Sequence, residues 1–139
     1  MESESSGGPQ ISLEHVSADR DGVLACWSIG WRIENLGEHP IHVGAVRLPH
    51  GQFKSVERRF DPAIELASGN KTELKILVKC DEPAGLVTEN AFVILSVDWL
   101  GEQWRIFVRL RVVVNANGEP ETRVELITTQ QLGFSGVSS

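Results

Sequence analysis

The chain has 139 residues, 41% of them hydrophobic and 23% charged, a length and composition typical of one globular domain that needs no disulfide support. Its net charge of −6 repels phosphate backbones, which disfavours nucleic acid as a partner. No apolar run approaches the ~20 residues of a membrane span, so the sequence predicts a soluble protein without a membrane segment.

Residues 1–9 are rich in serine, glycine and acidic residues, and we expect them to form a disordered leader. The stretch has neither a positively charged region nor an apolar one, so it does not have the pattern of a signal peptide. We therefore expect a cytoplasmic protein, or an extracytoplasmic one if the chain is a processed form.

Alternation of apolar and polar residues at period two predicts strands through most of the chain. An isolated glycine at a phase slip, Gly44, indicates a β-bulge. Residues 53–62 lack the alternation and are expected to be irregular, with only a short edge strand after Pro62. The strands are expected over residues 10–18, 23–34, 41–48, 63–66, 71–80, 91–99, 104–114 and 123–129.

The runs 91–99 and 104–114 are expected to form a hairpin. A turn centred on Gly101 and Glu102 suits the type II′ geometry, which has glycine first. That turn would pair Asp98 with Arg105 on the outer face.

Turns recur at roughly ten-residue intervals, as in antiparallel sandwiches. We therefore expect an all-β fold, an immunoglobulin-like antiparallel β-sandwich of about seven to eight strands, over residues 10–114. Residues 115–139 are expected to hold a linker, the possible extra strand at 123–129 and a mobile C-terminal tail.

The cysteines and tryptophans are expected to be structural. Cys26 and Cys80 fall in opposite phases of their strands, so we expect two free thiols. All tryptophans fall in the apolar phase, which favours core packing over a carbohydrate-binding platform. These are Trp27, Trp31, Trp99 and Trp104.

No chemistry-bearing motif stands out in the sequence. The four histidines lack the spacing of metal ligands, which predicts no metal site. Neither a phosphate-binding loop nor a nucleophile motif in its proper context is present. We therefore expect no catalytic residues, no cofactor and no enzymatic activity.

The outer face of the hairpin is the candidate interaction surface, because apolar side chains beside arginines are typical of interface cores and their anchors. The alternative is that the C-terminal segment covers this face, or that neighbouring acids such as Glu125 pair with its arginines. Since arginine binds carboxylates bidentately, the expected partner is another protein or an acidic peptide segment, the chain's own C-terminal tail included. The candidate residues are Phe92, Ile94, Arg105, Phe107, Arg109 and Arg111.

Several turn and core residues carry a family resemblance. Residues 31–37 read WRIENLG and are followed by PI at 40–41, and residues 64–69 read IELASG and lead into LKI at 74–76. In these features the chain resembles bacterial immunoglobulin-like accessory modules of the CARDB type, and more loosely those of the Hydin type.

The resemblance spans residues 29–114 and implies a non-catalytic adhesion, spacer or docking unit, often exported. The missing signal-peptide pattern departs from the exported members. Together, the observations favour a non-enzymatic protein-interaction or structural module. The alternative function is a carbohydrate-binding accessory domain, which exposed tryptophans would support. The oligomeric state stays open.

Overall fold

The computed structural model describes residues 7–22 and 25–132. Val23, Leu24, most of the expected leader and most of the expected C-terminal tail lie outside these ranges. Within them, no helix has the length and apolar character needed to cross a membrane. The described strands are β1 (Ile11–Arg20), β2 (Cys26–Asn35), β3 (Ile41–His50), β4 (Phe53–Leu66), β5 (Lys71–Cys80), β6 (Val87–Trp99), β7 (Glu102–Val114) and β8 (Pro120–Gln131).

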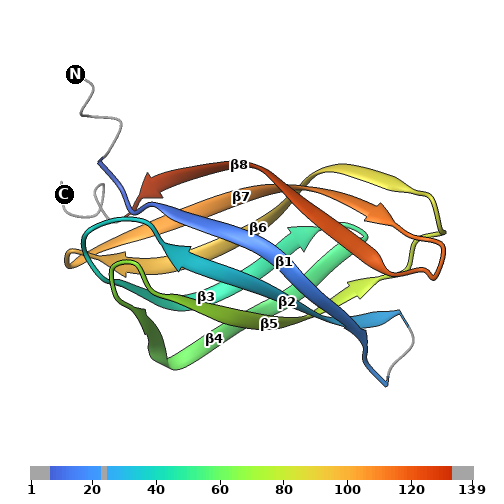
Figure 1. Ribbon diagram of the computed structural model, residues 1–139, viewed down its shortest axis with the longest axis horizontal. Helices are drawn as coiled ribbons and strands as arrows, with labels where there is room; N and C mark the ends of the chain where they lie inside the picture. The colour runs from blue at the N-terminus through green and yellow to red at the C-terminus, as the bar shows by residue number, and fades with distance from the viewer. Residues whose placement is uncertain (1–6, 23–24, 133–139) are drawn as a thin grey trace.

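The eight strands form one antiparallel sheet in the order β1-β2-β5-β4-β3-β6-β7-β8. The sheet curls until it nearly closes, so that β1 and β8 come to lie against each other (Figure 1). We call this line of contact the β1–β8 seam. The all-β, antiparallel prediction is confirmed, and the described part of the chain holds eight strands.

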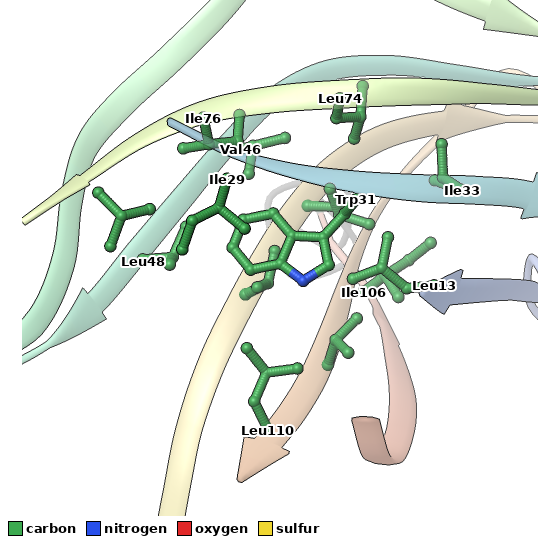
Figure 2. Close-up of a cluster of buried hydrophobic side chains, with 14 of the residues drawn as sticks. Leu13, Ile29, Trp31, Ile33, Val46, Leu48, Leu74, Ile76, Ile106 and Leu110 are labelled. Atoms are coloured by element: carbon green, nitrogen blue, oxygen red, sulfur yellow. The ribbon is translucent and has the colours of Figure 1, made fainter. Parts of the chain in front are cut away.

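The interior of the curled sheet is filled by the apolar residues that alternate along each strand. On β2, the inward positions Ile29, Trp31 and Ile33 are at most 1% exposed. Figure 2 shows the Trp31 indole among aliphatic side chains, with Ile106 and Leu110 of β7 also in the cluster. Burying each such side chain contributes about 1.5–3 kcal/mol, which makes this core the main source of stability.

The expectation for residues 53–62 is wrong, because β4 is a strand from end to end. Its pairing with β3 shifts register between Arg59 and Ile64, where β4 carries extra residues. Those residues interrupt the period-two pattern, which hid the strand in the sequence. The β-bulge expected at Gly44 is confirmed by register shifts toward both neighbouring strands.

The predicted hairpin of β6 and β7 exists, but the predicted turn is wrong. The two-residue turn is Leu100-Gly101, and its φ values are 53° and 77°. Positive φ at both positions makes it a type I′ turn, not the predicted type II′ turn. Arg105 therefore lies opposite Ser96, and Asp98 lies opposite Gln103. The predicted register differs from the observed one by two residues, an even number, so every side chain keeps its predicted face.

The extra strand expected at 123–129 is β8, which pairs with β7 along its whole length. One register shift, between Arg109 and Leu110 of β7, leaves Glu125 as the bulged residue of β8. The described part of the C-terminal segment thus extends the sheet sideways. It does not cover the outer face of the hairpin.

Candidate interaction surface

The outward side of β3, β6, β7 and β8 forms one continuous surface, which we call the arginine face. Strand register brings its side chains into cross-strand rows, because directly opposed residues lie on the same face. One row runs Arg47, Ile94, Phe107 and Thr128. The next runs Phe92, Arg109 and Leu126.

The six candidate residues all lie on this face, but they differ in exposure. Phe92, Arg105, Phe107, Arg109 and Arg111 are half-buried. Ile94 is only 7% exposed, contrary to the expectation of an open surface position. It lies on a central strand between two long side chains of its row, so it forms the floor of the face.

Two members of the face were missed in the sequence. Leu126 is 47% exposed beside Arg109, and Arg47 lies beside Ile94. Both occupy outward phases of their own strands, but only the strand order shows that β3 and β8 flank the hairpin. The sequence carries no signal for that order.

Few acids neutralise the arginines. Among the described residues, Arg111 Nε forms an ion pair with Glu89 Oε2 at 3.2 Å. Within the same residues, Arg47, Arg105 and Arg109 have no ion-pair partner, and the buried Nε atoms of Arg109 and Arg111 have no hydrogen-bond acceptor. A buried hydrogen-bond donor without a partner is uncommon in native proteins. The alternative, an ion pair with Glu125, is not observed among the described residues.

The arginine face has a hollow at each end of β7. The first, of about 280 Å³, has the small residues Gly44, Ala45 and Ser96 along its lining, together with Arg59 and Arg105. The second has a volume of about 260 Å³. It is lined by Arg111, Val113, Glu121, Thr122 and Arg123.

The tryptophans pack as the sequence predicts, with three buried and Trp99 half-buried. Trp99 packs edge-on against Trp104 with ring centroids 5.7 Å apart. This arrangement does not present the open row of rings that stacking on a sugar requires. Cys26 and Cys80 are free thiols, half-buried and buried respectively, as expected.

The half-buried His15 links the two sides of the β1–β8 seam. Its Nδ1 accepts a hydrogen bond from the backbone N–H of Thr122 at 3.2 Å and lies 2.9 Å from the Thr122 hydroxyl. That hydroxyl oxygen also accepts from Trp31 Nε1 at 3.0 Å. Burial lowers the pKa of His15 and outweighs the opposing effect of Glu119 and Glu121. Neutral His15 is therefore a structural residue of the seam.

No protein-family model matches the sequence, and no curated protein matches it significantly.

Proposed function

We propose that this chain is a non-enzymatic protein-interaction module that contacts its partner through the arginine face. We further propose that it is an immunoglobulin-like accessory β-sandwich, similar in kind to CARDB-type modules. Function has to be argued from a site, not from a fold, so the arginine face carries the first proposal.

The strand order supports the immunoglobulin-like assignment. Immunoglobulin domains place strands A, B, E and D in one sheet and C, F and G in the other. Here β1-β2-β5-β4 is followed by β3-β6-β7, which is the same succession joined through the β3–β4 hairpin. Among the described residues β4 pairs with β5 only at Phe53 and Lys54, so β4 is held mainly by β3 and the sheet is weakest between β4 and β5.

The observation that supports an interaction role is the composition of the arginine face. Half-buried phenylalanines and the exposed Leu126 lie among arginines, and of these Arg47, Arg105 and Arg109 lack acidic partners among the described residues. Apolar groups bordered by arginine are the composition of interface cores and hot spots. A continuous surface of this kind on a soluble domain requires an explanation, and a bound protein supplies one.

The test replaces Phe107 and Arg109 together, as Phe107→Ser with Arg109→Glu, in a co-purification experiment from native lysate. The matched control is Leu77→Ser with Lys79→Glu on β5, which makes the same two chemical changes at exposed outward positions. Both variants are expected to remain folded, because neither touches an inward side chain. Folding is checked by urea unfolding.

The proposal requires that the first variant loses the protein that co-purifies with the unaltered chain, while the control retains it. Equal retention by both variants would mean that the partner binds elsewhere. Unfolding of the first variant would show that the arginine face is part of the core. In that case the milder single change Arg109→Gln replaces the pair in the same assay.

A further inference from the structure

The first hollow lies on a cross-strand row that runs Arg59, Ala45, Ser96 and Arg105. Neighbouring strands are about 4.8 Å apart, so the two arginine backbones flank the hollow at a separation of about 14 Å. Because Ala45 and Ser96 between them are small, the two guanidinium groups can point toward each other over the floor of the hollow. An anionic group placed above Ser96 would be within reach of both.

Competing acids near this hollow are weakly placed. Arg59 lies 3.7 Å from Glu57, and its side chain is 78% exposed, a solvated pair that contributes little. Asp98 also lines the hollow, but it is exposed and lies opposite Gln103, not opposite an arginine. The hollow therefore retains cationic character from two arginines.

A second pair of arginines lies at the other end of β7. Arg111 and Arg123 are cross-strand partners, and both line the second hollow. Arg105 and Arg111 are six residues apart on one strand, a distance of about 20 Å. The surface between the two hollows carries Phe107 and its apolar neighbours. Glu121 also lines this second hollow and Arg111 is paired with Glu89, so its arginines are largely neutralised, and the cationic end of the apolar stretch is the first hollow.

This distribution of charge discriminates between anionic partners. A nucleic acid or another continuous polyanion would place charge along the whole face, including against Asp98 and Glu121 at the hollows. The net charge of −6 adds further repulsion. A peptide that carries one carboxylate at the first hollow and apolar side chains beyond it keeps its charge away from Glu121, and arginine binds a carboxylate in a bidentate manner.

We infer that the arginine face binds an extended segment of the partner that carries an acidic residue at one end of an apolar stretch. The acidic side chain occupies the first hollow, between Arg59 and Arg105, and the apolar side chains contact Phe107. This inference rests on the proposed function and specifies the chemistry of the partner.

The test is selection of random linear peptides displayed on phage against the full chain, followed by anisotropy titrations with the selected peptides. We expect selected sequences with an acidic residue next to an apolar stretch. Arg105→Glu and Arg59→Glu should each weaken binding by about tenfold or more, since a charge-assisted bond is lost and repulsion is added. Arg105→Lys should be intermediate, because it keeps the charge without the bidentate geometry. Lys79→Glu is the matched control and should bind normally.

The outcomes separate this inference from the proposed function. Selected peptides without acidic residues that still lose binding in the Phe107→Ser, Arg109→Glu variant overturn the acidic segment and leave the arginine face as the site. Peptides indifferent to every change on the face overturn both. Failure to select any peptide refutes the inference of a linear segment. Tight binding of a single-stranded oligodeoxynucleotide that depends on Arg105 would replace the peptide with a nucleic acid.

Discussion

The Thr122 hydroxyl is the hub of the β1–β8 seam, and removing it should destabilise the domain. Thr122→Val keeps the shape of the side chain but leaves the Trp31 N–H without the acceptor that it finds at 3.0 Å. Trp31 is 1% exposed, so the orphaned donor has little access to replacement water. An unsatisfied buried donor costs about 1–3 kcal/mol, a large share of the 5–15 kcal/mol that is typical of domain stability.

The change is measured by urea unfolding, followed through tryptophan emission. We expect a lower midpoint at an unchanged slope, because the loss is local and the surface exposed on unfolding stays the same. Thr128→Val is the control, an exposed threonine on the same strand, and its effect should stay within about 0.5 kcal/mol. Equal midpoints for Thr122→Val and the unaltered chain would refute the role given to this hydroxyl.

Three further predictions concern the same core. Burial lowers the pKa of His15, so the unfolded chain binds the proton more readily than the folded chain. The free energy of unfolding should therefore be highest above about pH 6.5 and fall as the pH drops below that value. His15→Gln should flatten that dependence in urea midpoints measured at several pH values, and an equally steep dependence would assign the effect to another group. Thiol labelling should count two cysteines in denaturant, and in the native state Cys26 should react before Cys80, whose burial raises its pKa; the reverse order would contradict the assigned faces. Trp31→Ala should cost about 3–5 kcal/mol in the same unfolding assay, and a cost below about 1 kcal/mol would be inconsistent with a central core position.

The sequence was most informative where one face of a strand is buried and the other is solvated. Residues 71–80 largely alternate, with the outward Leu77 as an exception, and β5 has those same bounds. The expectation failed at β4, where extra residues opposite β3 shift the phase. Alternation of apolar and polar residues reflects burial of one face of a strand, so a strand whose buried face changes along its length does not show the pattern.

The candidate surface was predictable in part for the same reason. The phases of β6 and β7 identified its phenylalanines and arginines, because the face of a side chain depends only on its own strand. The row Arg59, Ala45, Ser96 and Arg105 depends on the order of four strands and on two bulged registers. Long-range pairing of this kind has no local signature, so the hollow became visible only in the fold.

The turn between β6 and β7, which the sequence prediction placed one residue too late, leads to a final prediction. Leu100 occupies the first position of a type I′ turn at φ 53°, a conformation that strains an ordinary side chain and that asparagine tolerates well. Leu100 is 57% exposed, so Leu100→Asn gives up little packing. The substitution should stabilise the domain by about 1 kcal/mol, seen as a higher urea midpoint. Leu36→Asn, at a comparably exposed leucine outside the turn, is the control and should give no gain. If Leu100→Asn lowers the midpoint, the Leu100 side chain contributes packing that outweighs its strain, and the reasoning from turn geometry fails.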